Sequence, residues 1–204
     1  MTKAQLTPTT DLAPAVAKTA LKLSGPEWTR YFQGSRDTSG LAPDFRASVE
    51  SFIAAMRTAG ILVRPQSTFR PIERSYLMHW CWQIKHGIDP AEVPTAKGVL
   101  IEWAHASTDE SVKAAERMVT AYGMNDLHTP PALHSLHNDR EAIDMDISWT
   151  GTADVEDAEG TVVHVTTTPR SGMNPQLRQI GKSYGVIKFF GGASDKPHWS
   201  STGK

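Results

Sequence analysis

The sequence predicts an α+β fold: a small antiparallel sheet that carries the functional residues, packed by helices from the N-terminal half. Segments of helical periodicity come first along the chain, and strand-like segments follow them instead of alternating with them. A length of 204 residues is enough for one well-buried domain and short for two. We therefore expect residues 1–25, rich in Thr, Ala and Pro, to form a flexible arm, and residues 26–204 to form a single domain.

The helical segments have recognisable starts and stops. Residues 41–60 carry apolar side chains at spacings of three and four and end at a glycine. Residues 71–87 open with a proline and close with a glycine. Ser107 and Glu110 stand in capping-box spacing at the start of 107–123. The expected apolar stripe of the second helix consists of Ile72, Tyr76, Trp80 and Ile84.

The strand-like segments lie mainly in the second half of the chain. A short helix that opens at Asn174 and Pro175 separates the last two of them. Residues 88–107 contain prolines and form a connection to which the sequence assigns no structure. The expected strands are residues 61–69, 142–149, 161–168 and 185–190.

The segment AIDMDISW, residues 142–149, predicts a strand with one apolar and one acidic face. Side chains alternate between the two faces of a strand, so Asp144 and Asp146 share the face opposite the core. A strand that holds carboxylates on one face can present them to a cavity. The core-facing residues are Ile143, Met145, Ile147 and Trp149.

Two histidines can complete a metal site around this strand. His137 lies seven residues before Asp144 and can fold back over its face, and His198 comes from the tail segment DKPHW. Two imidazoles, one carboxylate and an open position make the layout of a catalytic zinc site. Asp195, three residues before His198, could accept the proton of the attacking water and pass it to the leaving amine.

These residues resemble the signature of a peptidase family. The segment SLHNDREAID resembles S-x-H-x-x-G-x-A-x-D, found in the zinc peptidases that include vancomycin-resistance D-alanyl-D-alanine peptidases and phage L-alanyl-D-glutamate endolysins. The lysostaphin and hedgehog domains are more distant members of this group. Ser135, His137, Ala142 and Asp144 match the signature, and Arg140 stands where the family has glycine. If that position needs a left-handed backbone, we expect arginine to be strained there.

The resemblance extends to the family's other landmarks. The second motif, an acidic residue followed three positions later by His, is similar to Asp195 and His198, and the family's arginine resembles Arg70 in STFR. The resemblance implies a zinc peptidase domain with His137, Asp144 and His198 as ligands. It further implies Asp195 as general base, and Arg70 as the residue that stabilises the oxyanion.

The resemblance also implies a substrate class, the stem peptides of bacterial peptidoglycan. Aspartate instead of glutamate at Asp195 is similar to the endolysin branch, which favours an L-Ala–D-Glu endopeptidase and leaves a D,D-carboxypeptidase as the other interpretation. Ser135 is expected to orient a ligand or contact substrate. Trp199, next to a ligand, is expected to bind substrate by walling the cleft, or else to close the core.

Other functions fit parts of the same pattern. The zinc site of a hedgehog-type relative retains metal without known turnover, so a cell-wall binding module is the alternative to an enzyme. Two histidines and one carboxylate also describe a non-haem iron oxygenase. Such iron sites place the first histidine and the carboxylate two residues apart, and here the separation is seven.

Composition limits the partners. A net charge of −1 gives no reason to expect nucleic acid, and no stretch is long and apolar enough to span a bilayer. The single cysteine, Cys81, is expected to be a small buried residue.

The N-terminal sequence does not resemble a cleavable secretory signal. We expect synthesis in the cytoplasm and action in the periplasm or cell wall after delivery by a phage holin, by lysis or by contact-dependent injection, which would imply an immunity protein.

Overall fold

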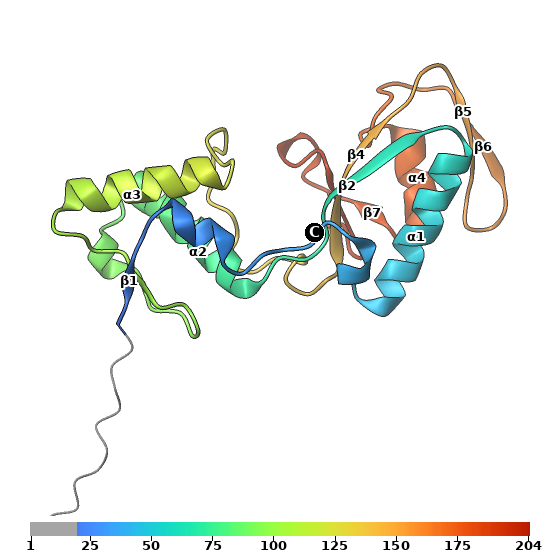
Figure 1. Ribbon diagram of the computed structural model, residues 1–204. Coiled ribbons are helices and arrows are strands. Elements are labelled where there is room, and N and C mark those ends of the chain that lie inside the picture. The colour runs from blue at the N-terminus through green and yellow to red at the C-terminus, as the bar shows by residue number, and fades with distance from the viewer. Residues whose placement is uncertain (1–19) are drawn as a thin grey trace, which may run out of the picture.

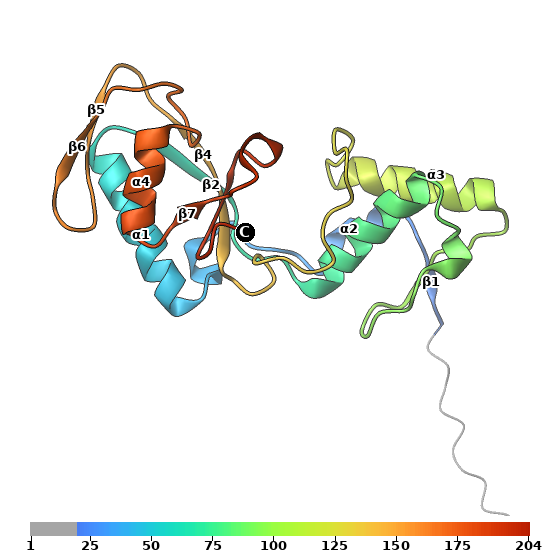
Figure 2. The same cartoon turned by 180° about the vertical axis from the view of Figure 1, so that it is seen from behind.

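The computed structural model describes residues 20–204, so most of the predicted arm lies outside the described residues. Four α-helices and antiparallel sheets are present in this part of the chain, with about 36% helix and 19% strand, and the α+β prediction is confirmed. These elements form two groups, which are visible from both sides in Figures 1 and 2. One group contains the main sheet with two of the helices, and the other contains the remaining two helices. We call them the sheet lobe (residues 33–70 and 133–204) and the helical lobe (residues 20–32 and 71–132).

The sheet lobe is built on four antiparallel strands in the order β2-β4-β8-β7. Strands β2 and β4 match the expected strands 61–69 and 142–149, whereas β7 is much shorter than the expected 185–190. The sheet strands are β2 (Leu62–Ser67), β4 (Ala142–Ser148), β7 (Ile187–Lys188) and β8 (His198–Ser200). A separate hairpin pairs β5 (Ala153–Glu156) with β6 (Val162–Val165).

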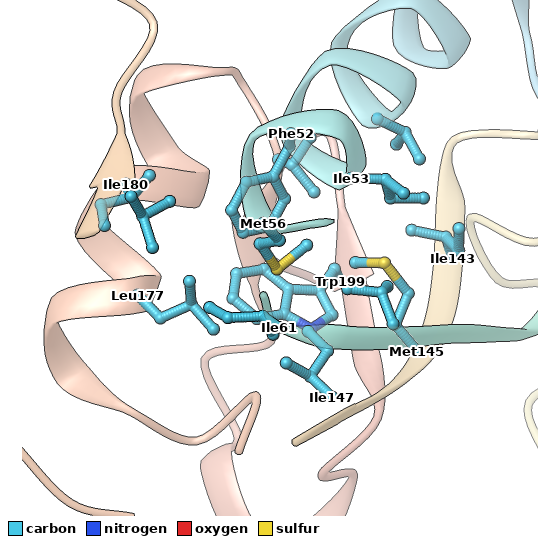
Figure 3. Close-up of a cluster of buried hydrophobic side chains, with 14 of the residues drawn as sticks. Phe52, Ile53, Met56, Ile61, Ile143, Met145, Ile147, Leu177, Ile180 and Trp199 are labelled. Carbon is cyan, nitrogen blue, oxygen red and sulfur yellow. The ribbon is translucent and has the colours of Figure 1, made fainter. Parts of the chain in front are cut away.

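Helices α1 (Pro43–Thr58) and α4 (Pro175–Ser183) close the core of the sheet lobe. The apolar face of β4 points into this core as the alternation predicted, and Trp199 of β8 lies at its centre (Figure 3). The rings of Trp199 and Phe52 are 5.5 Å apart between centroids. Short 3-10 turns flank these elements: η2 (Thr38–Gly40) and η4 (Gly192–Ser194).

The helical lobe has a hydrophobic core of its own, formed mainly between α2 (Ile72–Lys85) and α3 (Thr108–Ala121). Cys81 is fully buried in it, as expected. The lobe is completed by η1 (Pro26–Arg30), η3 (Pro90–Glu92) and the parallel pair β1 (Lys22–Leu23) and β3 (Ile101–Glu102). Thus β3 gives a structure to part of the unassigned connection 88–107, and β1 shows that the last residues of the predicted arm are paired.

The expected helix caps are present. The Ser107 side chain accepts a hydrogen bond from the main-chain N–H of Glu110 at 3.3 Å, and Asn174 caps α4 through the N–H groups of its first turn. Pro71 is the N-cap of α2 and not its first helical residue, because its ψ of 145° is extended. No helix within residues 20–204 combines the length and apolar character that crossing a membrane requires.

Candidate metal centre

The pairing of β4 with β8 brings Asp144 and His198 together. They are direct partners in the antiparallel register, and opposed residues of such a pair project from the same face of the sheet. The Asp144 Oδ1 and His198 Nδ1 atoms are 3.2 Å apart. Neighbouring residues in the register, Ile143 and Trp199, point to the core instead. The alternation that buries one face therefore exposes the acidic face to the site.

His137 reaches the same carboxylate from the turn before β4. Its ring is 2% exposed, and its Nε2 lies 3.3 Å from Asp144 Oδ1. On the other side of the ring, Nδ1 lies 3.4 Å from the carbonyl oxygen of Thr68. The Nε2 of His198 lies 3.1 Å from the main-chain oxygen of Lys204. Each histidine thus directs one nitrogen to Asp144 and the other to a main-chain oxygen, an arrangement that fixes tautomer and ring orientation in metal sites.

These three residues could hold a metal ion. Their ligand atoms all lie within 4.8 Å of one another, and the side chains are buried or nearly so. For ligands about 2.0–2.1 Å from a tetrahedral ion, adjacent ligand atoms are about 3.3–3.4 Å apart. The Asp144 contacts with His137 and His198, 3.3 and 3.2 Å, match that spacing. The set predicted from sequence therefore converges on a common centre.

Asp144 is held in its charged form. Burial alone would raise the pKa of its carboxyl, but hydrogen bonds and charge interactions with His137 and His198 outweigh burial and keep the pKa well below its ordinary value. An ionised carboxylate is the form that binds a cation. The carboxylate of Asp144 is therefore ionised at neutral pH.

Asp195 lies at the open side of the centre. Its Oδ2 is 3.9 Å from His198 Nδ1, and 48% of its side chain is exposed. Partial burial and the charge of Asp144 raise the pKa of Asp195 above its ordinary value. A carboxylate with a raised pKa is a stronger proton acceptor, which suits the predicted role of general base.

Arg70 projects into the same region from the segment between β2 and α2. Burial lowers the pKa of its guanidinium, and the charges of Asp144 and Asp195 oppose that effect. Within residues 20–204 no salt bridge engages this guanidinium. Its main-chain N–H donates to the carbonyl of His137 at 3.1 Å, and the side chain of Asn138 donates to its carbonyl at 2.7 Å. Arg70 is thus tied by its backbone to the loop that carries His137.

The centre opens into a groove of about 760 Å³ between the two lobes. Ser135 lines this groove, and its hydroxyl is buried without a hydrogen-bond partner in the described part of the chain. The sheet lobe contributes Arg70, Ser135, His137, Asp144, Phe189, Asp195 and His198 to the lining, and the helical-lobe side contributes Met78, Leu127, Thr129, Pro130 and Pro131.

Trp199 does not line the groove, which corrects its prediction as a substrate-binding residue. Its side chain is fully buried in the core of the sheet lobe, against Phe52 and α4 (Figure 3). Successive residues of a strand face opposite sides, so the neighbour of the ligand His198 must point away from the site. The alternative expectation, that Trp199 closes the core, is the correct one.

Phe189 is the aromatic residue that does line the groove, and the sequence did not single it out. Its ring meets that of His198 edge to face, with centroids 5.5 Å apart. The signal was the alternation in GVIKFF, which separates Phe189 from the buried Val186 and Lys188. Which of those faces meets the site depends on the pairing of β7 with β8, and periodicity does not reveal that pairing.

Arg140 has a left-handed backbone, with φ of 65°. The family signature has glycine at this position, and the structure supplies the conformation in which glycine is favoured. The guanidinium of Arg140 lies 4.4 Å from the centroid of the Phe69 ring, and its carbonyl accepts from the N–H of Ala42 at 2.9 Å. The arginine therefore retains the turn, with these contacts partly offsetting the strain.

No family model matches the chain, and the search of curated proteins gives no significant match. The functional interpretation consequently depends on the geometry of the centre and on the order of its residues along the chain.

Proposed function

We propose that this chain is a zinc-dependent peptidoglycan peptidase that hydrolyses a stem-peptide bond. The observation that carries the proposal is the convergence of His137, Asp144 and His198, with Asp195 and Arg70 in the same groove. Two imidazoles and one carboxylate suit zinc, and a set of three leaves a coordination position for a reactant. A purely structural zinc site would instead use four protein ligands.

Each residue around the centre would have a separate role in hydrolysis. Zinc, when bound, would polarise the scissile carbonyl and lower the pKa of water. Asp195 would accept the proton of the attacking water and deliver it to the leaving amine. Arg70, which forms no salt bridge within residues 20–204, would stabilise the negative charge that develops on the carbonyl oxygen. Ser135, which lines the groove, would orient a ligand or contact substrate.

Two features support a peptide substrate from the cell wall. The residues follow the order of the peptidase signature from Arg70 to His198, and the groove is lined by residues of both lobes. An endopeptidase that cuts L-Ala–D-Glu is favoured over a D,D-carboxypeptidase, because Asp195 is aspartate. Delivery would be by a holin, by lysis or by injection, and an injected enzyme would need an immunity protein as partner.

The test is digestion of purified peptidoglycan by the zinc-loaded protein, with released muropeptides identified by mass spectrometry. We expect new amino termini at one stem-peptide bond and no release after chelation of the metal. The terminus identifies the bond directly. Stoichiometric zinc binding without release from peptidoglycan of several chemotypes would contradict the enzyme and support a metal-retaining binding module.

A further inference from the structure

Lys188 is a buried lysine in strand β7, with 5% of its surface exposed. It is the register partner of Trp199, and its ammonium lies 5.4 Å from the centroid of that ring. A lysine is rarely buried unless its charge is compensated, because the ammonium loses its water. Its partners therefore indicate what it does in the fold.

The partners of Lys188 are main-chain carbonyls of a single turn. Its Nζ donates to the carbonyl oxygens of Asp195, Lys196 and His198, at 3.2, 2.6 and 2.7 Å. An ammonium has three donors, so these bonds use all of them. The turn that receives them carries both the proposed general base and one of the proposed metal ligands.

The rest of the sheet holds this turn only at its C-terminal end. The main-chain N–H of Met145 donates to the carbonyl of Pro197 at 2.9 Å, and His198 pairs with Asp144. Asp195 follows a single 3-10 turn, and both Asp195 and Lys196 are exposed. The carbonyl of His198 has a second donor, the N–H of Phe189, whereas the carbonyls of Asp195 and Lys196 have only Lys188 as donor among the described residues. Removal of the ammonium would leave those two carbonyls without a protein partner.

We propose that Lys188 is a positioning residue of the metal centre: through three bonds to one turn it sets the position of His198 and Asp195 relative to Asp144. The role of Asp195 depends on the proposed function, but the role of His198 depends only on metal binding. Outer partners that orient a metal ligand change metal affinity by about 10- to 100-fold when they are removed.

The test compares Lys188→Met with wild type in the full chain. We expect the zinc dissociation constant, measured by competition with a chromogenic chelator, to rise by about tenfold or more. Amide hydrogen exchange at residues 195–198 of the metal-free protein should accelerate. Lys188→Arg keeps the charge and the donors, and it should retain more of the zinc affinity than Lys188→Met.

Two control variants separate positioning from stability. Lys182→Met removes an exposed lysine of α4 and should leave zinc affinity unchanged. Val155→Ala removes buried volume in the core of the sheet lobe, away from the turn, and should lower global stability without weakening zinc binding. If Lys188→Met fails to fold, the comparison of Lys188→Arg with Val155→Ala still measures whether altered donors affect zinc affinity at similar stability.

Zinc affinity within twofold of wild type, together with unchanged exchange at residues 195–198, would overturn the positioning role. The outcome is distinct from failure of the peptidase proposal. A wild-type protein that binds zinc and releases no muropeptide, while Lys188→Met binds zinc more weakly, would reject the enzyme and support the role of Lys188.

Discussion

Asp144 links the two histidines of the candidate metal centre, because His137 and His198 both contact its Oδ1. Its low pKa also makes it a contributor to stability. The folded-state pKa lies below the ordinary value of about 3.9, so the unfolded chain binds more protons between those two values. The stabilisation is present above about pH 4 and is lost as the pH falls through the folded-state pKa.

We therefore predict that the difference in unfolding free energy between wild type and Asp144→Asn, both metal-free, shrinks as the pH falls from 6 to 2.5. Urea unfolding in the presence of a chelator, at each pH, measures this difference in unfolding free energy. Asp126→Asn, at an exposed loop position, serves as control and should show no such trend. A wild-type advantage that is constant over this range would mean that Asp144 has no stabilising interaction with the histidines.

Asp195 is proposed as a base and not as a ligand. Its carboxylate is 3.9 Å from His198 Nδ1 and half exposed, and it does not belong to the group of three whose ligand atoms all lie within 4.8 Å of one another. We predict that Asp195→Asn binds zinc near one equivalent while the rate of muropeptide release falls by roughly 10²-fold or more. Asp146 lies on the same face of β4 but accepts a hydrogen bond from the side chain of Gln66. Asp146→Asn should therefore keep both the zinc stoichiometry and the rate of muropeptide release. Loss of zinc from Asp195→Asn would show that Asp195 is a ligand.

The left-handed backbone of Arg140 costs conformational free energy that glycine at this position would not. We predict that Arg140→Gly is more stable than Arg140→Ala by about 1 kcal/mol, because both lose the contact with Phe69 and only alanine keeps the left-handed strain. Thermal or urea unfolding of the metal-free proteins measures the difference. Equal stability of the two variants would mean that the turn relaxes out of its left-handed conformation.

The sequence predicted which residues lie together at the centre. His137, Asp144 and His198 form the predicted group, and Asp195 and Arg70 line the same groove. Their roles as base and oxyanion ligand remain predictions. Phe189 and Lys188 were not singled out, and Trp199 was assigned to both faces of its strand. These three outcomes share one cause, because the face of a strand of two or three residues is set by its partner strand, and so short a segment has no periodicity to reveal it.

Among the elements, β4 was predicted well and β7 poorly. Burial alternates along β4 from Ile143 to Ser148, so its two faces were evident, whereas β7 has only two residues and no periodicity that reveals its pairing with β8. Helix α2 shows a similar limit. Its expected stripe included Ile72, which is 47% exposed, because the buried face turned toward α3 is centred on Leu77 and Cys81 instead.

Packing of α4 against β8 leaves no room for a side chain at Gly181. A Cβ there would lie 2.8 Å from both the Trp199 ring and the carbonyl oxygen of Val186. We predict that Gly181→Ala destabilises the protein by about 1–3 kcal/mol, although alanine favours helix by about 1 kcal/mol. Lys182→Ala, one residue further on the exposed side, should be near neutral. An unchanged or raised unfolding midpoint for Gly181→Ala would mean that α4 does not pack on Trp199 in this way.

Over the whole described chain, the elements form the two lobes seen in Figures 1 and 2. Among the described residues each lobe has one hydrophobic cluster, and residues of both lobes line the groove. The α+β class followed from the order of helices and strands along the chain. The strand order β2-β4-β8-β7 did not, because β2 and β8 both pair with β4 across more than 50 residues of sequence. The placement of α2 and α3 in a separate lobe did not either, because it depends on which helix faces pack together. Each lobe supplies one wall of the groove.

We propose that His137, Asp144 and His198 bind one divalent ion at a single centre. Anomalous diffraction at the zinc edge from crystals of the zinc-loaded protein tests this. We predict one peak about 2.0–2.2 Å from a nitrogen of each histidine and from an oxygen of Asp144, with a coordination position open toward the groove. A peak elsewhere, or three side chains without a common ion at full zinc loading, would contradict a shared metal centre.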